Sequence, residues 1–201
     1  MTSNPKTWLE NHPNYIISHN CNFGGAEWGS RWNGIEYERN HTYSYNRNYF
    51  AFDSDTEECA YYPSTIYDTT NRLVAIPAKY DIVFACGDWL VQNGTARASS
   101  YTNDNGTFPR TCFGWDDNYY YIFSCEGRGT YERGLYLDEV RDIFVANNVA
   151  NAIVFDGGGS VCLAARINNN VEKINRFRDA SLTYPALRAV GLCACYERRD
   201  V

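Results

Sequence analysis

The stretch 152–160 combines residues that could do chemistry where a buried strand ends. Residues 152–155 are all apolar, as is typical of a short strand inside a core. Asp156 follows, and then Gly157, Gly158, Gly159 and Ser160. Glycines allow close approach to a ligand, and their successive amides could form an anion-binding nest. The stretch is a candidate active-site floor; a tight turn capped by Asp156 is the structural alternative.

A second candidate lies near the N-terminus, where a strand beginning at residues 15–17 runs into small polar groups and two glycines. Asn20 could contact a substrate or orient a loop, and it could equally be a turn residue. Its neighbour His19 could carry a proton, because an imidazole titrates near neutral pH. The alternative for His19 is a partly buried polar side chain.

A third group comes from a predicted hairpin, with strands over 109–115 and 119–125 and a turn at 116–118. Antiparallel pairing would bring Arg110 and Thr111 close to Glu126 and Arg128. Arginine binds phosphate oxygens in a bidentate manner, so Arg110 and Arg128 are candidate phosphate ligands. An Arg110–Glu126 ion pair across the hairpin is the structural alternative.

The elements that must position these groups are mostly strands. Helical spacing of Leu137, Val140, Ile143 and Phe144 predicts one clear helix over 137–147. Further apolar runs predict strands at 49–53, 72–76, 81–86, 89–91, 161–165 and 186–196. Four segments lack such patterning. Residues 1–13 resemble a loose lead-in, and residues 26–48 are interpreted as a long loop or hairpin over the pocket. Residues 95–108 are interpreted as a flexible loop, and residues 171–183 are polar. The sequence predicts a single α+β domain over 1–201, with a twisted mixed, mostly antiparallel sheet and few helices.

Charge and composition narrow the class of partner. A net charge of −6 argues against a nucleic-acid or anionic membrane surface, and no apolar run reaches membrane-spanning length. The first 20 residues lack a secretory signal, which favours a cytoplasmic protein. Eight cysteines without a CxxC pair are then expected to be mostly free, buried thiols. Zinc is not expected, because the ligand spacing is wrong and the histidines are only His12, His19 and His41.

Several motifs occur in an order that resembles the phosphodiester glycosidase family over about residues 15–196. The most specific is Phe-Asp-Gly-Gly-Gly-Ser at 155–160, followed by Pro-Arg-Thr-x-x-Gly at 109–114. The remaining matches are Asn20 with Phe23, Gly34, Glu-Gly-Arg at 126–128, Gly-Leu-x-Leu-x-Glu-Val at 134–140, and Arg-Ala-Val at 188–190. Two departures stand out: Glu126 replaces the usual Asp, and Tyr136 replaces the Ser or Thr that would open the helix.

The resemblance implies hydrolysis of a sugar-1-phosphodiester at the anomeric carbon. Asp156 and Glu126 would share the acid and nucleophile or base roles, with Arg110 as the third catalytic residue. The expected substrate contacts are His19, Asn20, Thr111, Arg128, Gly157, Gly158, Gly159 and Ser160. No cofactor is required, and a divalent cation near Asp156 stays open. The short chain resembles bacterial and phage members, so a phage-encoded protein is one possibility.

Two rival functions follow from the same residues. One is an intracellular hydrolase of a nucleotide-sugar or cyclic nucleotide signal, of the kind phages use against host defence. The other is a non-catalytic binder of such a ligand. In each case the partner is a small molecule, either a sugar phosphodiester or a nucleotide-sugar, rather than nucleic acid or membrane. The oligomeric state is left open by the sequence.

Overall fold

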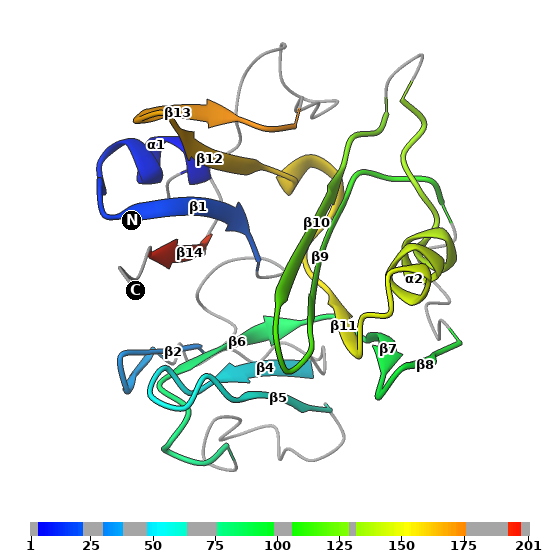
Figure 1. Cartoon of the computed structure of the whole chain (residues 1–201), viewed down its shortest axis with the longest axis horizontal. Helices are drawn as coiled ribbons and strands as arrows, with labels where there is room; N and C mark the ends of the chain where they lie inside the picture. The colour runs from blue at the N-terminus through cyan, green and yellow to red at the C-terminus, as the bar shows by residue number, and fades with distance from the viewer. Residues whose placement is uncertain are drawn as a thin grey trace.

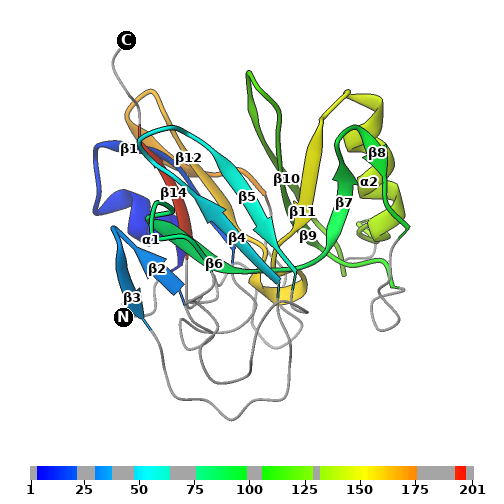
Figure 2. The same ribbon diagram turned by 90° about the horizontal axis from the view of Figure 1, so that it is seen from below.

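Alternating and continuous apolar runs fold into three antiparallel sheets, seen in a computed structural model that describes residues 4–21, 30–37, 48–63, 76–98, 106–128, 132–175 and 193–197. The first sheet has four strands in the order β13 (Asn170–Lys173), β12 (Leu163–Ile167), β1 (Tyr15–Asn20) and β14 (Cys193–Glu197). Figures 1 and 2 show this sheet facing a second layer of strands.

The second sheet carries the predicted hairpin. Its order is β10 (Tyr120–Cys125), β9 (Arg110–Trp115), β11 (Asn151–Val154), β7 (Trp89–Gln92) and β8 (Thr95–Ala96). The register pairs Cys125 with Arg110, so the two candidate arginines are brought to one end of the hairpin. The third sheet has the order β3 (Ile35–Tyr37), β2 (Ser30–Trp32), β6 (Ile82–Cys86), β4 (Asn48–Phe52) and β5 (Cys59–Tyr62).

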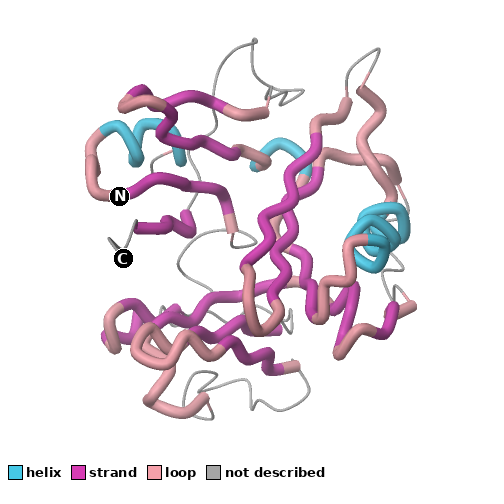
Figure 3. The backbone as a smooth tube through the Cα atoms, in the orientation of Figure 1, coloured by secondary structure: helices cyan, strands magenta, loops and turns pink. Residues whose placement is uncertain are grey.

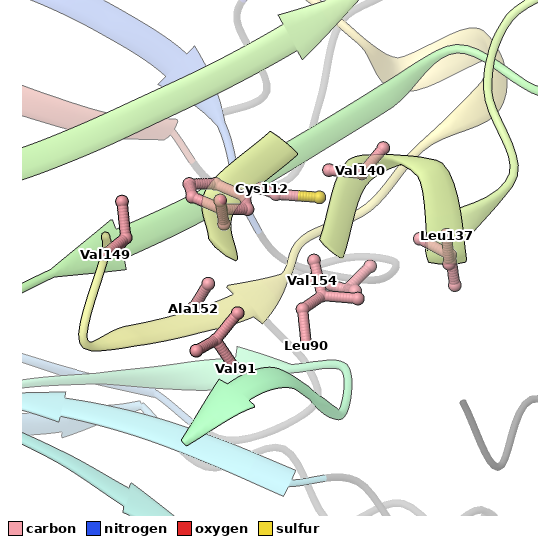
Figure 4. Packing of buried hydrophobic residues seen from close by; sticks show 9 residues of the cluster. Leu90, Val91, Cys112, Leu137, Val140, Val149, Ala152 and Val154 are labelled. Carbon is pink, nitrogen blue, oxygen red and sulfur yellow. The ribbon is translucent and has the colours of Figure 1, made fainter. Parts of the chain in front are cut away.

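Helix α2 (Leu137–Ala146) covers the outer face of the second sheet (Figures 1 and 2). Leu137, Val140 and Phe144 are buried there, where they pack with strand residues such as Ala152 and Val154 (Figure 4). The predicted helix is confirmed, but Ile143 is 40 % exposed rather than on the buried face. The backbone N–H of Tyr136 donates to Glu139 Oε2 at 2.9 Å, so Glu139 caps the helix despite the missing Ser or Thr.

An aromatic core joins the three sheets. Its buried members include Phe50 and Phe84 from the third sheet, and Phe113 and Trp115 from β9. Phe155 lies among them, with ring centroids 5.4 Å from Phe84 and 5.9 Å from Phe113. The residue that precedes Asp156 is therefore fixed in the core, and this fixes the start of the glycine loop.

The expectation of a few helices beside mostly antiparallel strands is confirmed, but the single mixed sheet is wrong. Every described strand pairing is antiparallel, and the strands divide among three sheets. Short apolar runs do not predict which strands pair, because pairing depends on contacts between residues that are far apart in the sequence. No helix among the described residues is both long and apolar enough to span a membrane.

The described parts of two unpatterned segments contain regular secondary structure. The expected lead-in contains helix α1 (Pro5–Glu10), drawn in cyan in Figure 3. The Asn4 side chain caps this helix by accepting from the Thr7 amide at 2.9 Å. Leu9 is fully buried, and one apolar residue in a polar stretch gives too weak a periodic signal. The polar segment after 170 begins with β13. Of the expected strand at 72–76 only Ile76 is described, and it lies in a bend. The end of the expected strand at 186–196 forms β14, whereas residues 186–192 and most of the loop at 26–48 lie outside the described residues.

Candidate active site

The glycine loop begins where β11 ends, and backbone hydrogen bonds fix its first two residues. The Phe155 amide donates to the Thr111 carbonyl at 2.9 Å, and the Asp156 amide donates to the Cys21 carbonyl at 3.0 Å. Thr111 belongs to β9, and Cys21 directly follows β1. Asp156 is therefore located where the first and second sheets meet.

Asn20 ties this junction together with its side chain. Its Nδ2 donates to the Asp156 carbonyl at 2.5 Å, and its Oδ1 accepts from Thr111 Oγ1 at 2.8 Å and from the Cys162 amide at 3.0 Å. Asn20 is 1 % exposed and Thr111 is fully buried. Both expected substrate contacts thus lie beneath the loop, where their polar groups are engaged in positioning Asp156.

Pro109 lies between the two glycine-containing motifs. A Cβ on Gly127 would come within 2.7 Å of Pro109 N, and a Cβ on Gly157 within 2.8 Å of Pro109 O. The Gly158 amide also donates to the Pro109 carbonyl at 2.9 Å. Both motifs need glycine because backbone packs directly on backbone here. The hairpin end and the glycine loop therefore meet at Pro109.

Arg128 is an exposed residue whose guanidinium lies against the glycine loop. Its Nη2 is 3.0 Å from the position that a Cβ on Gly158 would take, and Gly158 has a φ of +59°. Among the described residues no carboxylate or carbonyl is bonded to this guanidinium, although it lies over the Phe108 ring at 5.7 Å. An arginine held next to a glycine turn, with its donors available, suits an anionic ligand.

Arg110 is held differently from Arg128. It is 3 % exposed, and its Nε and Nη2 donate to the carbonyls of Leu135 and Gly106 at 3.0 and 2.8 Å. These bonds brace the segments on either side of the hairpin end. The structure therefore brings both arginines to the site, with Arg110 inside the wall and Arg128 at the surface.

Phe108 is a site residue that sequence reasoning missed, because residues 95–108 read as a flexible loop. Its ring contacts both guanidiniums, with Arg110 Cζ 5.2 Å from the centroid. Its backbone exchanges two hydrogen bonds with Leu135, and a Cβ on Gly134 would clash with it at 2.5 Å. The useful signal was an aromatic residue placed directly before the Pro-Arg-Thr motif.

The amide nest forms only in part. Gly158, Gly159 and Ser160 make a 3₁₀ turn, η3 (Gly158–Ser160). The Gly158 amide is engaged by Pro109, and the Ser160 amide donates to the Gly157 carbonyl at 3.2 Å. Within the described chain, the amides of Gly157 and Gly159 have no such backbone acceptor. Two of the four expected donors are thus used by the fold itself.

His19 lies inside the protein rather than on the site surface. It is fully buried and stacked between Phe155 and Tyr196, at 5.6 and 5.5 Å. Its Nδ1 is 2.7 Å from the Asn20 carbonyl oxygen and its Nε2 is 2.9 Å from the Tyr196 hydroxyl. Burial lowers the pKa of His19 to about 4, against a partial opposing effect of its backbone hydrogen bond. A neutral, enclosed imidazole supports β1 and is poorly placed to reach a substrate.

The second candidate carboxylate, Glu126, follows β10 directly and precedes the Gly127 contact with Pro109. Glu126 and Asp156 each directly precede a glycine that packs against Pro109. Within the described ranges no cluster of three or more His, Cys, Asp or Glu residues could hold a metal ion. The chemistry available from these residues is that of carboxylates, an arginine and backbone amides.

Comparisons with known proteins identify a family and a similar fold. The sequence profile of the phosphodiester glycosidase family matches residues 38–193. The fold resembles the zebrafish N-acetylglucosamine-1-phosphodiester alpha-N-acetylglucosaminidase catalytic domain auto-inhibited by its pro-peptide, with a TM-score of 0.73 and 17 % identity, over 99 % of this chain and 68 % of that one.

A hypothetical protein from Synechocystis also aligns, with a TM-score of 0.49 and 13 % identity over 82 % of this chain and 50 % of that one. A search of curated protein sequences gives no match. The family profile spans more than half of the sequence, including the Pro-Arg-Thr, Glu-Gly-Arg and glycine-loop motifs. The chain belongs to the phosphodiester glycosidase family.

Proposed function

We propose that this protein hydrolyses a glycosyl phosphodiester and breaks the bond between the anomeric carbon and the phosphate oxygen. The observation that carries the proposal is the exposed residue Arg128, whose guanidinium packs against Gly158, two residues after Asp156. This arrangement pairs a cation for the phosphate with a carboxylate for the sugar. Membership of the phosphodiester glycosidase family supports the same reaction class.

The residues would divide the work by charge. Arg128 and the amides of Gly157 and Gly159 would bind the phosphate, which carries the negative charge of the leaving group. Asp156 and Glu126 would face the sugar, where an oxocarbenium-like transition state develops positive charge. Asn20, Thr111 and Arg110 would hold the loop and the hairpin end in register. Water supplies the hydroxyl that ends on the anomeric carbon, and the phosphate leaves as a monoester.

Isotope labelling tests the bond that breaks. The protein is incubated in H₂¹⁸O with a panel comprising UDP-N-acetylglucosamine, a methyl diester of N-acetylglucosamine 1-phosphate and a cyclic dinucleotide. For the first two compounds the proposal expects turnover with ¹⁸O in the released sugar and unlabelled phosphate. It expects no turnover of the cyclic dinucleotide, which has no bond between an anomeric carbon and a phosphate oxygen. Label in the phosphate would contradict it, because that outcome means P–O cleavage.

Asp156→Asn serves as the catalytic control in the same assay. It should abolish turnover while the melting temperature stays near that of the wild type, because Asn keeps the size of the side chain and leaves the backbone hydrogen bonds of residue 156 in place. Binding of every panel member without turnover by the wild type would favour the non-catalytic binder. Wild-type activity in Asp156→Asn would remove this carboxylate from the mechanism.

A further inference from the structure

A separate cavity of about 350 Å³ lies between the first and third sheets. Its described walls come from β2, β4 and β6 on one side and from β14 on the other, and these two layers face each other in Figures 1 and 2. Trp32 and Tyr120 line it and are 38 % and 40 % exposed, whereas Phe113 and Phe155 are buried. The cavity therefore runs from surface aromatics down to the aromatic core.

The wall is almost entirely hydrocarbon. Phe50, Phe52, Phe84, Ile82 and Val83 line the third-sheet side, and Ala194 lies opposite on β14. A volume of this size falls in the range of small-molecule pockets, about 300–1,000 Å³. Since an apolar cavity of about 150 Å³ holds one benzene ring, this one could hold a group of roughly two rings.

The only charged side chain in the described part of the wall is Arg31, and its guanidinium is bonded within the protein. Arg31 donates to the carbonyls of Ile76, Pro77 and Tyr80, at 3.2, 2.9 and 2.9 Å. A sugar, a nucleobase or a phosphate placed here would bury polar groups without adequate partners, which is costly.

The tyrosine and cysteine groups are engaged in the same way. The Tyr196 hydroxyl is 2.9 Å from His19 Nε2, and the Tyr120 hydroxyl donates to the Glu57 carbonyl at 3.1 Å. Cys195 Sγ lies 3.4 Å from Ser18 Oγ. An uncharged hydrocarbon requires none of these groups, so it is the occupant that fits.

We infer that this cavity is a binding site for an uncharged hydrocarbon group of about two rings, distinct from the proposed phosphodiester site. The inference does not depend on the proposed activity, because the cavity walls contain neither Asp156 nor Arg128. Naphthalene is a suitable probe, since it has the required size and no hydrogen-bonding group.

The test measures thermal unfolding of the wild type with and without naphthalene. At a free concentration ten times its Kd, the ligand should raise the melting temperature by about 3–5 °C. Ala194→Leu places a larger side chain in the cavity and should remove the shift. Ala146→Leu makes the same change on the exposed end of α2 and should retain it.

A second measurement covers the case in which Ala194→Leu fails to fold. Nuclear Overhauser effects in the wild type should connect naphthalene protons to the Ala194 methyl group. Three results would overturn the inference: no shift in the wild type, an equal shift in a folded Ala194→Leu, or contacts to methyl groups elsewhere only. Glucose 1-phosphate, which matches the other site's chemistry, should give no contact with Ala194.

Discussion

The side-chain amide of Asn20 donates to the main-chain carbonyl of Asp156 across 2.5 Å, although 136 positions separate the two residues. The same side chain accepts from Thr111 and Cys162. One buried amide therefore connects β1, β9 and the glycine loop. This arrangement makes Asn20 a positioning residue for the candidate carboxylate.

Replacing Asn20 should damage stability and activity together. Asn20→Ala leaves the Thr111 hydroxyl and the Cys162 amide without their acceptor, so the free energy of unfolding should fall by about 3 kcal/mol. Urea unfolding measures the loss. Asn147→Ala removes an exposed amide that bonds only to the Ile143 carbonyl in the described chain, and should cost less than about 1 kcal/mol. Equal losses of unfolding free energy in the two variants would contradict the role of Asn20 as a positioning residue.

The two arginines should respond differently to the same substitution. Arg128→Lys keeps the charge but loses the planar fork, so kcat/KM should fall about tenfold or more with little change in melting temperature. Arg110→Lys breaks bonds to the carbonyls of Leu135 and Gly106, so unfolding should cost about 2 kcal/mol less. Melting curves and kinetics on both variants separate these effects. If Arg110→Lys keeps its stability but loses tenfold in kcat/KM, Arg110 binds the phosphate directly.

Phe108 should act through Arg128. Phe108→Leu removes a ring face worth about 1 kcal/mol to a nearby cation, which predicts roughly a fivefold fall in kcat/KM. The effect should shrink when Arg128 is already lysine, as a double-mutant cycle would reveal. Phe123→Leu, beside Phe144 on the α2 side of the sheet, is the matched control and should alter stability alone. If the two substitutions lower kcat/KM by independent factors that multiply in the double variant, Phe108 does not act through Arg128.

His19 should make the fold acid-sensitive. Burial lowers its pKa to about 4, so the unfolded chain binds a proton more readily than the folded chain between pH 6.5 and 4. The stabilisation by neutral His19 is complete above pH 6.5, and about 3 kcal/mol of it should be lost by pH 4. Urea unfolding across this range should show a flatter profile for His19→Gln. An unchanged slope in His19→Gln would disprove the assignment.

The cysteines offer a chemical test. All eight are described, and none forms a disulfide there. Burial raises the pKa of the Cys59 and Cys195 thiols to about 12 and that of Cys162 to about 11, so the folded protein should react slowly with a thiol reagent at neutral pH. Denatured, unreduced protein should release most of the eight thiols. Finding few would place the protein in an oxidising compartment.

The sequence by itself determined the local chemistry and most local elements. The apolar run before Asp156, the hairpin that carries Arg110 and Arg128, and helix α2 follow from short-range periodicity and turn residues. The order of motifs was sufficient to indicate the family. Each of these signals can be read along the chain without knowing which distant residues come into contact, so no knowledge of the tertiary structure was needed.

Only the tertiary structure decided which groups remain available to a ligand. Arg110 and Arg128 look equivalent in the sequence. In the structure, the guanidinium of Arg110 is buried and donates to two backbone carbonyls, whereas that of Arg128 lies against the Gly158 turn. In the sequence, Asn20 and His19 look like residues at the surface of a site. In the structure both are buried and hydrogen-bonded to residues more than 100 positions away in the chain. Burial and hydrogen-bond partners are properties of the assembled sheets, and no local pattern specifies how three sheets pack.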